Sequence, residues 1–153
     1  MDVGERPVGS IMKGEVRTVD EGERIDDVLQ SCSSLGVTDL VVVSPEGRFE
    51  GVVTSTEILN YINPLVGVRT GRKLGHHFIM GECPRVSSMM SRTHATVRKD
   101  TPLSTALRHM RKDHRHYLVV LDESDRVVGR LDLCDVISHL IEAGVIVPSS
   151  CEL

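Results

Sequence analysis

The stretch GVVTSTEILNYI, Gly51 to Ile62, is nearly repeated seventy-eight residues later as GRLDLCDVISHL, Gly129 to Leu140. Both stretches contain a glycine, a short apolar run, an oxygen-bearing side chain and an acid three residues further on. At the same offset, residues 8–59 match residues 86–137 without a gap. A repeat of this length predicts two units that fold alike.

The helices follow from the hydrophobic spacing. Apolar residues recur with helical spacing over 25–35 and again over 103–110, which predicts one amphipathic helix in each copy. The second of these helices is expected to begin at Thr101 as N-cap, with Pro102 in its first position. A last helix, over 55–62 or 133–141, closes each copy.

The strands follow from the apolar runs. Continuous runs at 40–43 and 118–121 each precede a polar turn and a further short apolar run, which predicts paired strands. A short lead strand is expected at Thr18–Val19 and at Thr96–Val97. Three strands with two helices cannot bury both sheet faces alone, so we expect an α+β fold of two β-α-β-β-α repeats, packed sheet to sheet about a pseudo-twofold axis.

Composition excludes several classes of protein. The chain has 153 residues, 40% of them hydrophobic, with 18 basic and 22 acidic residues and a formal charge of -4. This balance disfavours nucleic acid as a partner. No apolar run approaches the roughly 18 residues of a membrane span, and the first ten residues lack signal-peptide features, so a cytoplasmic protein without membrane contact is expected.

Catalytic and metal-binding motifs are not evident. The four cysteines are far apart, which argues against a disulfide framework or a zinc ribbon. The adjacent His76 and His77 cannot easily serve one tetrahedral zinc site, and no cysteine lies at ligand spacing. The sequence shows no phosphate-binding glycine loop and no nucleophile with its own base, so we do not expect an enzyme.

In their order and spacing, these features resemble a tandem pair of cystathionine β-synthase (CBS) domains, also called a Bateman module. The shared features are the lead tripeptides SIM and SMM, the TV pairs, the helix, the valine-rich strand and the terminal glycine-to-acid pattern. The resemblance divides the chain into repeat 1 at 7–63, a linker at 64–85, repeat 2 at 86–143 and a C-terminal tail at 144–153, with the two repeats forming one compact module.

The resemblance implies a regulatory module that binds an adenosine compound, such as AMP, ADP, ATP or S-adenosylmethionine, in clefts between the repeats. Binding would shift the population of conformations and so signal to a regulated protein that the sequence does not identify. No resident cofactor is implied, although Mg²⁺ can accompany a nucleotide. The family usually dimerises through its helices, and the apolar residues available for such a face are Val136, Ile137, Leu140 and Ile141.

Two interpretations of the repeated stretch stay open. In the structural one, Thr54 caps a helix and Glu57 reaches back to it, while Asp132 and Asp135 form a rougher version of the same capping box. In the functional one, the helix N-terminus offers free N–H groups to an anion, and the acid accepts the hydroxyls of a ribose.

The resemblance assigns ligand contacts residue by residue. They are Thr18, Val19, Thr38, Asp39, Leu40, Thr54 and Glu57 in the first copy, and Thr96, Val97, His116, Tyr117, Leu118, Asp132 and Asp135 in the second. The candidate phosphate partners are Lys13, Arg92 and Arg115.

The chain departs from the family pattern at three places. Glu57 replaces the usual Asp, Asp132 replaces the usual Thr or Ser, and Val41 and Val119 replace a frequent proline. Two carboxylates near one pocket would oppose a phosphate unless a cation or a basic side chain intervenes. A ligand-free oligomerisation or protein-interaction scaffold, and a cation sensor using Asp132 and Asp135, therefore stay open as alternatives.

The linker contains the densest basic stretch, formed by Arg69, Arg72, Lys73, His76 and His77. Its glycines and prolines predict irregular structure. We expect an exposed connection, while folding over a pocket, docking of a partner or weak contact with RNA are further interpretations.

Overall fold

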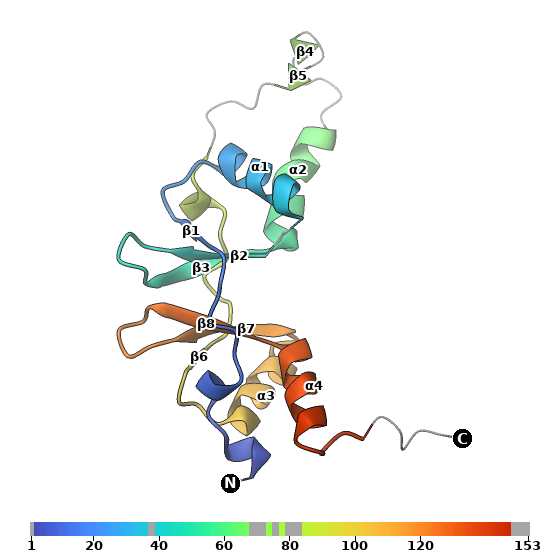
Figure 1. The fold of residues 1–153 in the computed structure, drawn as a ribbon. Helices are drawn as coiled ribbons and strands as arrows, with labels where there is room; N and C mark the ends of the chain where they lie inside the picture. Colours follow the sequence, from blue (N-terminus) through green and yellow to red (C-terminus); the bar gives the residue numbers. More distant parts are fainter. Residues whose placement is uncertain (1, 37–38, 68–72, 75–76, 79–83, 148–153) are drawn as a thin grey trace, which may run out of the picture. The chain divides into compact units, whose positions relative to one another are not determined.

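The computed structural model describes two compact units, and all statements below refer to residues 2–36, 39–67, 73–74, 77–78 and 84–147, without the side chains of 63–83 (Figure 1). The first-copy unit spans Arg17–Thr93. The second-copy unit combines Met1–Val16 with His94–Leu153. Each unit therefore holds the sheet and helices of one repeat.

The first-copy unit has a three-stranded sheet in the order β1-β2-β3. Strand β1 (Thr18–Asp20) is parallel to β2 (Leu40–Val43), which is antiparallel to β3 (Phe49–Val53). Helix α1 (Ile25–Leu35) connects β1 to β2, and helix α2 (Ser55–Gly67) follows β3. The expected β-α-β-β-α order is confirmed for this copy.

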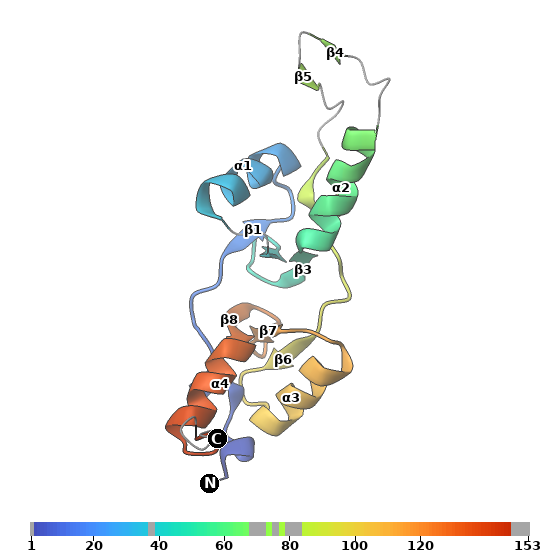
Figure 2. The same cartoon turned by 90° about the vertical axis from the view of Figure 1, so that its right-hand side faces the viewer.

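The second-copy unit has the same topology, with sheet order β6-β7-β8. Strand β6 (Thr96–Arg98) is parallel to β7 (Tyr117–Leu121), which is antiparallel to β8 (Val127–Asp132). Helix α3 (Leu103–Lys112) connects β6 to β7, and helix α4 (Leu133–Glu142) follows β8. In each unit both helices lie on one face of the sheet (Figure 2).

Short elements complete the described chain. Three 3₁₀ helices lie at Val3–Glu5, Val8–Ser10 and Val86–Ser88. Within the linker, β4 (Lys73–Leu74) pairs antiparallel with β5 (His77–Phe78). None of the described helices is long and apolar enough to cross a membrane.

Each hydrophobic core lies between a sheet and its two helices. In the second-copy unit Leu118 and Val120 of β7 belong to this core together with residues of α3 and α4. Because side chains alternate along a strand, Tyr117, Val119 and Leu121 point to the opposite, helix-free face. This alternation decides which side chains of β7 belong to the core of the unit and which lie on the other face of the sheet.

The residues that precede the first strand of each repeat, 8–13 and 86–91, are called its lead segment. Each lead segment packs in the unit that holds the sheet of the other repeat. Val8 is fully buried in the core of the second-copy unit, where its N–H donates to the carbonyl of Thr101 over 2.9 Å. Val86 is fully buried in the core of the first-copy unit, where its N–H donates to the carbonyl of Glu23 over 2.9 Å. The two repeats thus exchange their lead segments.

The exchange explains the glycine that opens each repeated stretch. Ser91 lies so close to β3 that a Cβ on Gly51 would stand 2.5 Å from its carbonyl oxygen. Lys13 crosses β8 in the same way, and a Cβ on Gly129 would stand 2.7 Å from its carbonyl oxygen. Only glycine leaves room for the crossing backbone.

Paired backbone hydrogen bonds fix both crossings. Val52 and Ser91 exchange N–H donors and carbonyl acceptors over 2.9 and 2.8 Å. Lys13 and Arg130 do the same over 3.0 and 2.9 Å. Each lead segment therefore forms one isolated antiparallel bridge with the strand that it crosses.

Two expected helix boundaries are wrong. Helix α3 begins at Leu103 with Pro102 as its N-cap, because the Thr101 hydroxyl instead accepts the N–H of Arg98 over 3.1 Å. Helix α2 continues through Pro64 to Gly67. The proline ring fixes a φ close to the helical value, so a helix can continue through it with the loss of one backbone hydrogen bond.

Other expectations fall outside the described residues. Thr38, Arg69, Arg72 and His76 are among them, as is the end of the tail from residue 148. The mutual packing of the two units and the division of the chain into repeats, linker and tail stay predictions.

The crossings yield a first test. We expect Gly51→Ala and Gly129→Ala each to lower the free energy of unfolding by about 1–3 kcal/mol, because a methyl group overpacks the backbone contact. Urea unfolding measures the change. Gly14→Ala is the control, since no atom lies within 4 Å of a Cβ at Gly14. Equal stability of all three variants would contradict the crossing.

Candidate functional site

Thr54 and Glu57 interact at the start of α2. The backbone N–H of Thr54 donates to Glu57 Oε2 over 2.7 Å, and the Thr54 hydroxyl donates to the same oxygen. Thr54 Oγ1 in turn accepts the N–H of Thr56 over 3.3 Å. The capping interaction expected from the TSTE sequence is confirmed, and it holds the Glu57 carboxylate over the first turn of the helix.

The matching box in the second copy does not form. Asp132 is the N-cap of α4 but makes no side-chain capping hydrogen bond. Its Oδ1 accepts from Arg130 Nε over 2.8 Å, and Asp135 Oδ1 lies 3.4 Å from Lys13 Nζ. The expected rougher capping box is therefore wrong. Charge-assisted contacts with two basic side chains replace the weaker capping bonds.

An aromatic stack lies beside these acids on the helix-free face of the second sheet. The rings of His94 and Tyr117 stack with centroids 4.4 Å apart, and the Arg130 guanidinium carbon lies 3.8 Å from the Tyr117 centroid. His116 meets Tyr117 edge-on at 5.5 Å. The strand register places Tyr117 opposite Asp132, so the stack and the acid pair form one cluster.

His94 and Arg130 were missed by the sequence analysis. His94 precedes the lead strand, outside the family pattern. Arg130 matches Val52 of the first copy, and a charged residue at a strand position that is otherwise apolar was the available signal.

Burial controls the charge of His94, whose side chain is 5% exposed. Burial, together with the positive charge of Arg115, lowers the pKa of His94 to about 4, while the nearby Tyr117 backbone opposes both effects. His94 is therefore a neutral ring at physiological pH. It stacks on Tyr117 without adding charge to the cluster.

A cavity of about 190 Å³ lies against the edge of the first sheet. It contains three of the predicted ligand contacts, and its lining residues are Arg17, Thr18, Val19, Glu23, Ser31, Cys32 and Leu40. Arg17 supplies a positive charge that the sequence analysis did not select. Burial raises the pKa of the Cys32 thiol, so this residue lines the cavity as an uncharged thiol.

The remaining predicted contacts are spread over both units. Val97 and Leu118 are buried in the core of the second-copy unit, so their side chains serve packing. Asp39 is half-buried just before β2, and Thr96 lies on β6 opposite Val119. The structure does not gather these residues into one described pocket.

The candidate phosphate partners differ in what they contact. Lys13 is paired with Asp135, and Arg92 Nη1 lies 3.4 Å from Glu50 Oε2. Arg115 is close enough to His94 to lower its pKa. Lys13 and Arg92 are 64% and 60% exposed, so solvent weakens both ion pairs.

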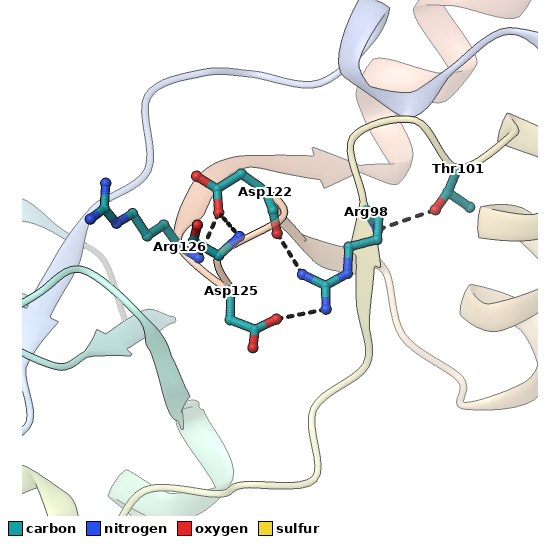
Figure 3. Close-up of polar contacts among 6 residues, drawn as sticks. Arg98, Thr101, Asp122, Asp125 and Arg126 are labelled. Carbon is teal, nitrogen blue, oxygen red and sulfur yellow. Dashed lines mark hydrogen bonds and ion pairs between the residues drawn. The ribbon is translucent and has the colours of Figure 1, made fainter.

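A second cavity, of about 320 Å³, lies at the end of the second sheet where β6 and β7 end, and it is lined by none of the predicted contacts. Two of its charged groups are engaged, since Arg98 Nη2 lies 2.6 Å from Asp125 Oδ1 and Asp122 Oδ1 accepts the N–H of Arg126 over 3.0 Å (Figure 3). This arrangement stabilises the turn between β7 and β8.

Metal ligation finds no support in the described residues, where no three His, Cys, Asp or Glu side chains gather around one point. Asp132 and Asp135, the proposed basis of a cation sensor, each contact a basic side chain. A cation would have to displace Arg130 or Lys13 to bind them.

Comparisons with known proteins agree with this fold. A family model described as the CBS domain matches residues 8–64 and 86–142. A homoserine O-acetyltransferase of Methanococcoides burtonii is 27% identical over 129 residues, which cover 84% of this chain and 23% of that protein. The chain thus spans about a quarter of that relative's length.

Solved structures show the same fold. The crystal structure of CBSX2 in complex with AMP is 22% identical, with a TM-score of 0.69 and coverage of 91% of this chain and 98% of that one. A CBS domain pair in complex with 5′-methylthioadenosine and S-adenosyl-L-methionine is 20% identical, with a TM-score of 0.66 and coverage of 90% and 97%.

The depressed pKa of His94 yields a second test. Its folded-state pKa of about 4 lies below the roughly 6.5 of an unfolded histidine. The unfolded chain therefore binds more protons between these values, so stability is full above pH 6.5 and falls by up to about 3 kcal/mol as the pH drops toward 4. Urea unfolding from pH 7 to 4 measures this loss.

The wild type is compared with His94→Phe, a variant that keeps an aromatic ring at this position but has no group that titrates. We expect its pH profile to be flatter than that of the wild type. The exposed His109→Gln should keep the wild-type profile. Parallel profiles for wild type and His94→Phe would rule out a depressed pKa at this site.

Proposed function

Because the chain belongs to the CBS domain family and carries two tandem copies, we propose that it is a regulatory module that binds an adenosine compound. AMP, ADP, ATP and S-adenosylmethionine are the candidate ligands. Two structural neighbours carry AMP or S-adenosyl-L-methionine, which supports this ligand class for the present chain.

The cavity beside β1 is the observation that carries the proposal. Strand β1 is an edge strand that pairs only with β2, so the outer backbone groups of Thr18 and Val19 are not used by the sheet. A purine edge presents both donors and acceptors of hydrogen bonds and can bind such a strand. The Arg17 guanidinium in the same cavity suits a phosphate.

The carboxylate of Glu57 is the proposed ribose contact. Leu40, which lines the cavity, pairs across the ladder with Val53, directly before Thr54. The capping bonds from Thr54 fix the carboxylate at this end of the sheet. Glu57 is one methylene longer than the usual Asp, so a ribose would sit correspondingly further from the helix.

Signalling is proposed to follow from differential binding. The chain passes between the two units near residues 16–17 and 93–94. Each lead segment packs in the unit of the other repeat, so a ligand that moves either segment acts on the unit that holds it and on the chain that leads to the other unit. A ligand that prefers one arrangement shifts the population toward it and changes the surface that a regulated protein recognises.

We propose that two copies dimerise through α4, but on a different face of the helix from the one expected from the sequence. Val136 is 1% exposed and Leu140 packs against the core of its own unit, so neither is available as expected. Leu133, Ile137 and Ile141 are 42%, 41% and 40% exposed and recur every four residues along the helix. This apolar stripe is the proposed contact between copies.

A ligand-free scaffold is the second candidate, favoured by one observation. Glu57 is already bound by Thr54 without any ligand, as a purely structural cap would be. In that case the protein would act through association alone.

Thermal melting with AMP, ADP, ATP, S-adenosylmethionine or Mg²⁺ tests the proposal. A ligand at about 100 times its Kd adds roughly 2.7 kcal/mol of stability, which for a chain of this size raises the Tm by about 5–10 °C. We expect one adenosine compound to produce this shift and Glu57→Gln to remove it. Asp27→Asn, which removes an acid from the same third position of α1, should leave the shift intact.

If no compound moves the Tm at millimolar concentration, ligand sensing is rejected and the scaffold takes its place. Sedimentation velocity then becomes the decisive measurement. In that case wild type should sediment as a dimer and Ile137→Lys as a monomer, because a lysine charge opposes burial of the α4 stripe.

A further inference from the structure

We propose that Arg130 fills the adenosine site of the second copy and keeps it closed, so that each chain binds a single ligand, in the first copy. This inference rests on the proposed function. It concerns which copy binds and which residue decides it.

Arg130 is held in place from three sides. Its Nε contacts Asp132 Oδ1 at 2.8 Å, and its guanidinium lies over the Tyr117 ring at 3.8 Å. Its backbone is bonded in both directions to Lys13. The side chains of Arg130 and Asp132 are only 22% and 23% exposed, so solvent screens this pair less than an exposed one.

The acids of this copy are withdrawn from a ribose. Asp132 is bound by Arg130, and Asp135 Oδ1 is paired with Lys13. Asp135 Oδ2 is buried and has no hydrogen-bond partner in the part of the chain that the structure describes. Because Oδ2 is buried, a diol would meet Oδ1, which is already paired with Lys13.

The ring of Tyr117 is also occupied by two neighbouring side chains. His94 stacks on one side and the Arg130 guanidinium lies on the ring as well. A purine base that needed this aromatic surface would have to displace a cation that is favourably placed on it. Loss of the Arg130–Asp132 contact would add to that cost.

The first copy has no counterpart of the Arg130, Tyr117 and His94 side chains. At the offset of seventy-eight residues, Val52 stands for Arg130, Asp39 for Tyr117 and Val16 for His94. Glu57, which stands for Asp135, takes its hydrogen bonds from the uncharged Thr54. The cavity beside β1 lies in this same unit.

The test counts bound ligand by equilibrium dialysis of the full chain against labelled AMP, with ATP and S-adenosylmethionine in parallel. We expect one ligand per chain for the wild type and two for Arg130→Val, which installs the residue of the first copy. Arg108→Ala removes an exposed arginine from α3 and should keep the count at one. Arg130→Gln, which keeps the length but not the charge, repeats the test if the valine variant does not fold.

Two results would overturn the inference while leaving the proposed function intact. One is two ligands bound to the wild type, and the other is no gain, or a loss, with both Arg130 variants. Absence of binding to wild type and variants with all three compounds would instead reject the proposed function, and this inference with it.

Discussion

The close crossing of each lead segment over the sheet of the other repeat is the constraint on which both units depend. It requires Gly51 and Gly129, because a side chain at either position would meet a backbone carbonyl. It also places a buried valine from one repeat in the core of the other. Neither repeat therefore completes its own core.

The same crossing shapes the chemistry of the two copies differently. In the second-copy unit it brings Lys13 to Asp135 and binds the backbone of Arg130, so basic side chains neutralise both acids. In the first-copy unit the matched crossing brings Ser91 to Val52, and Glu57 is held by Thr54 instead. The same repeated stretch thus gives an acid pair bound by basic side chains in one copy and a carboxylate bound by an uncharged threonine in the other.

The sequence predicted the order of elements well because hydrophobic period and repetition report local structure. It predicted the Thr54–Glu57 cap because both partners lie in one turn. It missed the exchange of lead segments and the Arg130–Tyr117 stack, because those contacts join residues distant in the chain or on opposite strands. The rougher Asp132–Asp135 box was wrong because spacing alone does not reveal competing cations.

Backbone amide chemical shifts, recorded by NMR as AMP is added, test the central claim most directly. The account predicts saturable shifts at Thr18, Val19 and Glu57, with much smaller changes at Thr96, Tyr117 and Asp135. Shifts at none of these residues, at AMP concentrations up to the millimolar range, would contradict ligand sensing. Equal shifts in both groups would contradict the difference between the copies.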